Sequence, residues 1–89
     1  MFELRFSSKS KKFVKKCDEK IRNRLKAAFE EISQNPFPAQ NYDLQKVAGE
    51  ESTYRIRISS YRIVYEVHSK ENIIKIIKVE RRKNRTYNF

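Results

Sequence analysis

Three arginines in one short stretch, Arg55, Arg57 and Arg62, are the residues whose type and spacing could do chemistry. Arg55 and Arg57 alternate with apolar residues, and Arg62 follows after Ser59-Ser60. An arginine stays charged at physiological pH and presents a planar fork of donors that matches a phosphate group. Several arginines around a reacting phosphate would also stabilise the charge that develops on its oxygens. The stretch therefore indicates phosphate binding, with phosphoryl chemistry as its sharper interpretation.

The stretch Thr53–Val64 is typical of a two-stranded hairpin whose turn is Ser59-Ser60. That turn would pair Arg57 with Arg62, and the two-residue period of a strand would place all three arginines on one face. Like charges directly opposite each other destabilise a sheet. The acid of the same strand and face, Glu66, lies roughly 13 Å along from Arg62 and cannot neutralise all three. We therefore expect an anion-binding role, the alternative being that the arginines are simply solvated.

The elements that must position this hairpin follow from apolar spacing. Residues 2–7 alternate as a half-buried strand, and Ser7 or Ser8 can cap the helix that follows. A second helix is expected from Asp18-Glu19 to the stretch 33–36, with a break between the two helices near residues 16–19. Beyond a loop at 35–43, strands are expected at 44–47, 53–58, 61–68 and 73–79, and residues 81–89 form a basic tail.

This order, βααββββ, predicts a single α+β domain over residues 1–89, with a helical hairpin and an antiparallel β-meander. The strand 61–67 carries apolar residues on both of its faces and should be central. The helix pair can cover one face of the sheet, which leaves the face with the arginines open.

Charge is the strongest compositional signal, because 21 Lys and Arg stand against 11 Asp and Glu in 89 residues, a formal net charge of +10. Residues 53–89 hold most of the excess, with ten basic and three acidic side chains. Such a field favours nucleic acid as partner, although a basic surface without a specific ligand has the same composition. No apolar run approaches a membrane span or a secretion signal, and the lone Cys17 cannot form an internal disulfide. We therefore expect a cytoplasmic protein.

The segments YRIR (54–57), YRIVYEV (61–67) and IIKIIKVERRKNRTY (73–87) resemble the RelE family of toxins from bacterial and archaeal toxin–antitoxin pairs. The family pattern is a Tyr-Arg-apolar-Arg strand, a short turn, a second Tyr-Arg strand, and a strand that ends in basic residues and a tyrosine. The start FSSKSKKFVKK (6–16) is similar to the family's strand-to-helix junction. The likeness covers nearly the whole chain in element order and length.

This resemblance implies a ribosome-dependent endoribonuclease that cleaves messenger RNA in the ribosomal A site, without metal or other cofactor. It also implies a cognate RelB-like antitoxin as partner, beside the ribosome with its messenger and ribosomal RNA. The family's basic catalytic positions fall on Arg55, Arg57, Arg62 and Arg82, and its C-terminal tyrosine falls on Tyr87. Glu80 stands where many relatives have glycine or histidine, and the tail has no histidine.

Cleavage without metal uses the 2′-hydroxyl of RNA as nucleophile on the adjacent phosphorus and yields a 2′,3′-cyclic phosphate. We assign Arg57, Arg62 and Arg82 to stabilising the phosphorane charge and Arg55 to the phosphate or the leaving group. Tyr87 is assigned to proton transfer or base stacking, since an arginine is too weak an acid to exchange protons. Further RNA phosphate contacts are expected at four other basic residues: Arg81, Lys83, Arg85 and Lys46.

Other residues with reactive side chains are expected to be structural. His68 lacks a partner at metal or catalytic spacing and is predicted to be a surface residue, and Cys17 is predicted to be a small core residue. The lysines between residues 9 and 16 form either a solvated helix face or a contact with ribosomal RNA phosphates.

Two other functions fit the composition. The ParE-type branch of the same fold poisons DNA gyrase and does not cleave RNA, and gyrase poisons generally lack this set of arginines with the C-terminal tyrosine. A non-enzymatic nucleic-acid-binding module would need only the basic surface, and it would tolerate the loss of any single arginine.

Overall fold

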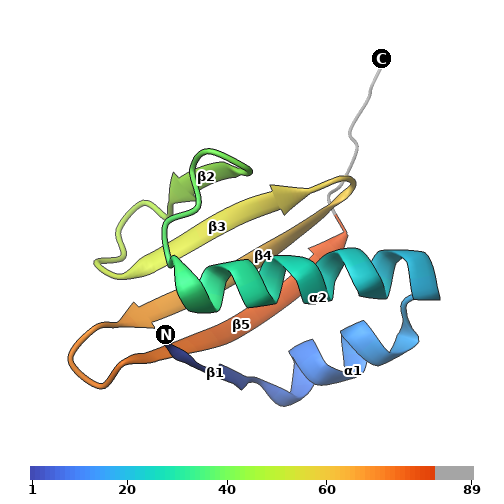
Figure 1. Ribbon diagram of the computed structural model, residues 1–89, viewed down its shortest axis with the longest axis horizontal. Coiled ribbons are helices and arrows are strands. Elements are labelled where there is room, and N and C mark those ends of the chain that lie inside the picture. Colours follow the sequence, from blue (N-terminus) through green and yellow to red (C-terminus); the bar gives the residue numbers. More distant parts are fainter. Residues whose placement is uncertain (82–89) are drawn as a thin grey trace.

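The computed structural model of the chain describes residues 1–81, so the predictions made for residues 82–89 lie outside the described part. Its elements are β1 (Glu3–Phe6), α1 (Ser8–Lys16), α2 (Glu19–Gln34), β2 (Asp43–Lys46), β3 (Thr53–Ile58), β4 (Tyr61–His68) and β5 (Ile73–Arg81). This order confirms the predicted α+β fold, with an N-terminal strand and a helical hairpin before the meander (Figure 1).

The five strands form one sheet in the order β1-β5-β4-β3-β2. Strands β2 to β5 pair with one another in antiparallel fashion, which confirms the meander, and β4 is central as its apolar pattern predicted. Strand β1 pairs in parallel with β5, a pairing that the sequence pattern did not predict. The last strand of the described residues therefore lies beside the first, and β1 and β2 form the two edges of the sheet.

Both helices begin at a side-chain cap. The Ser10 amide donates to the Ser7 hydroxyl over 3.1 Å, and the Ile21 amide donates to the Asp18 carboxylate over 2.9 Å. Arg22 of α2 donates to the carbonyls of Lys15 and Cys17 at the end of α1, over 3.2 and 2.6 Å. These terminal carbonyls have no partner within their own helix. The two helices are thus fixed to each other at the break between them.

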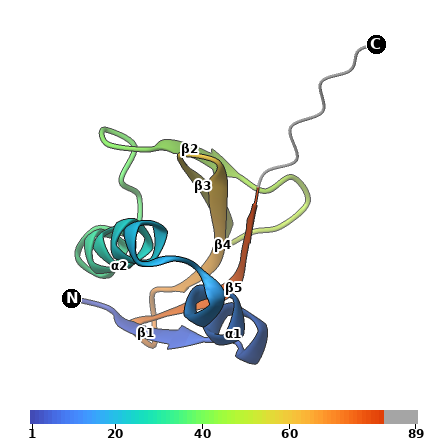
Figure 2. The same cartoon turned by 90° about the vertical axis from the view of Figure 1, so that its right-hand side faces the viewer.

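The core lies between the helices and one face of the sheet. Apolar side chains of α2 pack against alternate residues of the three long strands, and the buried set is Leu25, Ala28, Phe29, Ile32, Ile56, Ile58, Ile63, Tyr65, Val67, Ile74, Ile76 and Val79. Figure 2 shows both helices on the same side of the sheet. Within residues 1–81, the helices therefore cover one face of the sheet, as predicted, and leave the other face without a helix.

A β-bulge in β5 changes which face its side chains occupy. Val64 pairs with Lys78 and Tyr65 pairs with Ile76, so Ile77 is the extra residue. Ile74 and Ile76 are buried before the bulge, and Val79 is buried after it. The extra residue shifts the two-residue alternation by one position, so the side chain of Glu80 falls on the uncovered face.

Several strand boundaries differ from the predicted ones: β1 is one residue shorter at each end than the predicted 2–7, and β2 ends at Lys46 rather than Val47. Strand β5 continues two residues beyond Val79 to Arg81, and β2 begins at Asp43, which the sequence pattern assigned to a loop. The reason is cross-strand pairing, since Glu80 lies in register with Arg62 and Asp43 with Arg57. A charged residue at the end of a strand carries no apolar signal in its own segment, so its partner on the next strand decides where the strand ends.

Replacing Tyr65 with phenylalanine is expected to lower the free energy of unfolding by about 1 kcal/mol. Tyr65 is fully buried, and its hydroxyl donates to the Pro36 carbonyl over 2.7 Å, which ties the loop after α2 to β4. Loss of the hydroxyl leaves that carbonyl without its donor. Urea unfolding measures the effect. Tyr54→Phe is the matched control, because the Tyr54 hydroxyl has no hydrogen bond within residues 1–81, and an equal loss in both variants would contradict the role of the bond.

Candidate functional site

The two arginines predicted to face each other do so in the sheet. Arg57 of β3 and Arg62 of β4 are cross-strand partners, Ile58 pairs with Tyr61 around the two-residue turn, and Arg55 pairs with Val64, which confirms the predicted hairpin register. Because side chains alternate along a strand, the arginines lie on the face that the helices leave uncovered. Arg57 and Arg62 therefore leave adjacent strands side by side on the sheet face away from the helices.

The expectation that no acid neutralises these arginines is wrong. Arg57 Nη1 lies 3.0 Å from Asp43 Oδ2, and Arg62 Nε lies 2.6 Å from Glu80 Oε2. Asp43 is the register partner of Arg57 on β2, and Glu80 is the register partner of Arg62 on β5. The four side chains form one row across four strands with the charge order minus, plus, plus, minus, and we call it the Arg57/Arg62 row.

Each arginine of the row donates to its carboxylate through one guanidinium nitrogen. Arg62 uses Nε and Arg57 uses Nη1, and within residues 1–81 their other guanidinium nitrogens have no hydrogen-bond partner. The Arg57–Asp43 pair is about half exposed, at 49% and 48% of the side chains, whereas Arg62 and Glu80 are 31% and 29% exposed. Both forks thus keep N–H donors for an external anion, and the Arg62 pair is the less hydrated one.

The carboxylate of Glu80 is held in its charged form by two cations. Partial burial opposes ionisation, but the hydrogen bond and charge of Arg62, together with Lys78, outweigh it and lower the pKa of Glu80 below its ordinary value. The second contact is between Lys78 Nζ and Glu80 Oε1, over 3.4 Å. Glu80 is therefore an anion throughout the neutral pH range.

Arg55 extends the same surface toward the other end of β3. It lies two residues from Arg57 on the same face, and its Nη2 donates to the Gln45 side-chain oxygen over 2.5 Å. Because Gln45 is neutral, it does not compensate the positive charge of Arg55. Lys78, in register with Val64, adds a second cation to this part of the face.

The structure does not bring all of the predicted site residues to this face. Lys46 alternates with Gln45 along β2, and Arg81 alternates with Glu80 along β5, so both side chains leave the sheet on the side opposite to the Arg57/Arg62 row. The remaining predicted residues lie outside residues 1–81; they are Arg82, Lys83, Arg85 and Tyr87.

Sequence reasoning missed two residues of the row, Asp43 and Glu80. The number of residues between each carboxylate and its arginine could have predicted the pairs, because antiparallel pairing of neighbouring strands brings Asp43 level with Arg57 and Glu80 level with Arg62. Such a prediction needs the strand order and the bulge, which the sequence alone did not supply.

The reactive residues outside the row have local partners. His68 Nε2 lies 2.9 Å from Glu66 Oε1 on the same strand. Cys17 is partly buried between the helices, where burial, and then the charge of Asp18, raises the pKa of its thiol. A raised thiol pKa lowers its reactivity, in accord with a packing role.

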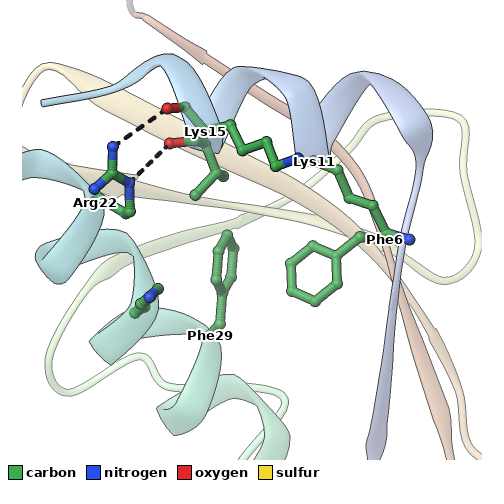
Figure 3. A pocket seen from close by; sticks show the side chains of 7 residues that line it. Phe6, Lys11, Lys15, Arg22 and Phe29 are labelled. Atoms are coloured by element: carbon green, nitrogen blue, oxygen red, sulfur yellow. Dashed lines mark hydrogen bonds between the residues drawn. The ribbon is translucent and has the colours of Figure 1, made fainter. Parts of the chain in front are cut away.

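A second surface with an unusual composition lies on the helical side. A groove between β1, α1 and α2 has an apolar floor of Phe6, Val14 and Phe29, whose two aromatic rings meet edge to face at 4.9 Å. Its rim is cationic and consists of Lys11, Lys15, Arg22 and Lys26. In Figure 3 the rings of Phe6 and Phe29 lie side by side, below the side chain of Lys15 in this view. Apolar surface beneath a ring of positive charge is typical of a site for an acidic, amphipathic partner.

No helix within residues 1–81 is long and apolar enough to cross a membrane.

Comparison with known proteins places this geometry in context. The family model of the ParE toxin of the type II toxin–antitoxin system parDE matches residues 4–86. A protein of Methanocaldococcus jannaschii, named provisionally as the toxin RelE1, is 34% identical over 59 residues, a span of 66% of either chain. The match thus covers about two thirds of that relative's length.

Two solved structures share the fold. A chain of the archaeal RelE–RelB complex from Pyrococcus horikoshii OT3 superposes with a TM-score of 0.83 and 24% identity, over 91% of this chain and 94% of that one. A chain of the intact E. coli RelBE toxin–antitoxin complex superposes with a TM-score of 0.78 and 26% identity, over 94% of this chain and 100% of that one.

Replacing Glu80 with glutamine is expected to lower the free energy of unfolding near pH 7 by about 1 kcal/mol or less, because it removes a partly exposed ion pair. Since the pKa of Glu80 is depressed in the folded state, its stabilisation is present above the ordinary value of 4.5 and is lost as the pH falls through the folded-state pKa. Urea midpoints of the two proteins should therefore differ at neutral pH and converge in acid. Glu71→Gln, in an exposed turn, controls for net charge, and a difference from wild type that persists unchanged in acid would refute this origin.

Proposed function

The chain belongs to the RelE/ParE family of toxins of type II toxin–antitoxin systems, and from that premise we propose that it is an endoribonuclease. It cleaves messenger RNA in the ribosomal A site without a metal ion, inhibits translation, and is neutralised by a cognate antitoxin. The observation that carries the proposal is the pairing of Arg57 with Arg62 on the uncovered face of the sheet. Two adjacent forks with free N–H donors suit one phosphate and the charge that it gains during transesterification.

The proposed reaction transfers no group to the protein. The 2′-oxygen of the nucleotide attacks its own 3′-phosphorus and loses its proton, the bond from phosphorus to the 5′-oxygen breaks, and that oxygen takes up a proton. The products are a 2′,3′-cyclic phosphate and a 5′-hydroxyl. Arg57 and Arg62 stabilise the dianionic phosphorane, and Arg55 contacts the phosphate or the leaving group. Arg82 would further stabilise the negative charge of the phosphorane, and Tyr87 would transfer a proton or stack on a base.

The ribosome has a defined part in this proposal. In-line attack requires the 2′-oxygen, the phosphorus and the 5′-oxygen to lie in line, and free single-stranded RNA seldom holds that geometry. The entropy lost in reaching the in-line geometry is a large part of the barrier in such reactions. A messenger already fixed in the A site loses little further entropy on reaching the transition state. We therefore place the reaction in the cytoplasm, on translating ribosomes.

The antitoxin is proposed to be acidic and amphipathic. The similar chains from Pyrococcus horikoshii and E. coli occur in complexes of RelE with RelB, and a net charge of +10 calls for an acidic partner. The groove between β1, α1 and α2 offers such a partner an apolar floor, and the cationic rim offers charge pairing. An apolar floor suits the apolar side chains of an amphipathic protein, whereas a polar face with arginines suits phosphates, so we assign the groove to the protein partner and the uncovered sheet face to RNA.

Poisoning of DNA gyrase is the second candidate, because the family model that matches residues 4–86 is that of the ParE toxin. The paired arginines favour RNA cleavage, because that reaction needs cations to stabilise the charge on the phosphorane. The two activities differ in their immediate product, which is a cut message in one case and a trapped gyrase complex in the other.

Arg57→Ala and Arg62→Ala are each expected to lower the rate of messenger cleavage in a translating extract by roughly 10²-fold or more, the usual cost of losing one donor to a developing oxyanion. Primer extension on the message measures the cut. Arg5→Ala is the matched control, because Arg5 is also an exposed arginine in a salt bridge, but on the edge strand β1.

The same variants separate the alternatives. Growth arrest with intact messages and blocked supercoiling would favour gyrase poisoning. Wild-type protein that binds RNA without cutting it, and for which each alanine merely weakens binding, would favour a binding module. Circular dichroism confirms that each variant is folded.

Lys11→Glu combined with Lys26→Glu is expected to weaken binding of the antitoxin by at least about tenfold, because two attractive rim charges become repulsive. Isothermal titration with the cognate antitoxin measures the affinity. Lys70→Glu with Lys20→Glu, which makes the same change of charge away from the groove lining, is the control. Equal effects of the two double variants would show that only net charge matters and that the groove is not the docking site.

A further inference from the structure

We infer that Asp43 and Glu80 are built-in counter-anions that keep the arginine pair from binding free RNA, so that they restrict the reaction to messenger held by the ribosome. This inference rests on the proposed function. Neither carboxylate belongs to the set of basic and tyrosine positions that the family likeness implies. Their role is derived from the Arg57/Arg62 row, in which each arginine is matched by one carboxylate in register.

Each carboxylate accepts from its arginine the kind of bond that a phosphate oxygen would accept. Asp43 Oδ2 and Glu80 Oε2 accept charge-assisted hydrogen bonds over 3.0 and 2.6 Å. A phosphate oxygen would bind a guanidinium by the same kind of bond. The row is neutral as a whole, with two cations and two anions, so an incoming phosphodiester meets a surface whose nearest positive charges are already paired.

In this proposal, the carboxylates compete with RNA phosphates for the two arginines, and this competition gives selectivity for RNA that is already held in position. A carboxylate on the adjacent strand is present at a high effective concentration, which RNA diffusing in solution cannot match. RNA that is fixed beside the row by other contacts has a high effective concentration of its own and competes on equal terms. The phosphate then takes the remaining N–H donors of both forks, and the carboxylates stay as orienting groups or yield their bonds.

Stability does not account for the row. The face is open to solvent, and ion pairs at such sites contribute only about 0 to 1 kcal/mol each. Neutral residues at positions 57 and 62 would avoid the repulsion between two arginines and would need no carboxylates. The bulge in β5 is also costly to a regular ladder, yet it is the feature that turns Glu80 toward Arg62.

The other charged groups facing the row do not replace the carboxylates. Lys78 of β5 contacts Glu80 and adds positive charge, and Arg55 of β3 is paired with the neutral Gln45. Glu66 of β4 is on the same face but is paired with His68. Within residues 1–81, Asp43 and Glu80 are thus the two anions in contact with the arginine pair.

The test compares Asp43→Asn/Glu80→Gln with Glu50→Gln/Glu51→Gln, a double variant of equal net charge in the turn before β3. The probe is a short 2′-O-methyl oligoribonucleotide, which cannot be cleaved and is titrated by fluorescence anisotropy. Removing the counter-anions should tighten binding by about tenfold relative to the control. The slope of log K against log salt should steepen by about 1.4, because two more cations reach phosphates. Each single variant should show part of the effect, which covers the case in which the double variant fails to fold.

Equal affinity and equal salt slope in the two double variants would overturn the inference. Because the probe is not cleavable, this readout is independent of the proposed nuclease activity. Cleavage of free messenger by Asp43→Asn/Glu80→Gln, with little cleavage by wild type, would support both. Tighter binding without cleavage by any protein, on the ribosome or off it, would support the counter-anions and refute the nuclease.

Discussion

Two guanidinium groups directly opposite each other in a sheet repel, and much of this small fold serves to hold Arg57 and Arg62 in that arrangement. The hairpin turn sets the register, and each flanking strand brings one carboxylate level with one arginine. The carboxylates make the pair tolerable and fix one nitrogen of each fork. In the proposed function the remaining donors bind the phosphate, and their preorganisation distinguishes such a site from arginines that are only solvated.

The division of the sheet into a covered and an uncovered face separates two tasks. On the covered face, apolar side chains of α2 and the long strands form a thin but continuous core, and the hydroxyl of Tyr65 secures the loop after α2. The helices in turn create the groove over Phe6 and Phe29, with its cationic rim. The protein thus presents positive charge on both sides, over apolar surface on one side and over a polar sheet on the other. The first suits a folded protein partner and the second suits phosphates.

The sequence was sufficient for most of the fold and for half of the Arg57/Arg62 row. Apolar alternation predicted the strands, apolar residues at helical spacing predicted the helices, and the two-residue turn at Ser59-Ser60 predicted the register of the hairpin. The parallel pairing of β1 with β5 was not predicted, since it depends on contacts between distant segments. Asp43 and Glu80 were missed because each is a charged residue at or next to the end of its strand, where it carries no apolar signal of its own. Glu80 also lies past a bulge that reverses the alternation, so a strict two-residue period would have placed it on the covered face.

The central claim is that Arg57 and Arg62 act on one and the same phosphate, and a double-mutant cycle on the cleavage rate tests it most directly. Single-turnover cleavage on programmed ribosomes would be measured for wild type, the two single alanine variants and the double variant. Groups that serve one reacting phosphate act as a unit, so their losses do not add. The account predicts that the double variant is scarcely slower than the slower single variant. Losses that multiply would place the two arginines on separate phosphates and contradict it.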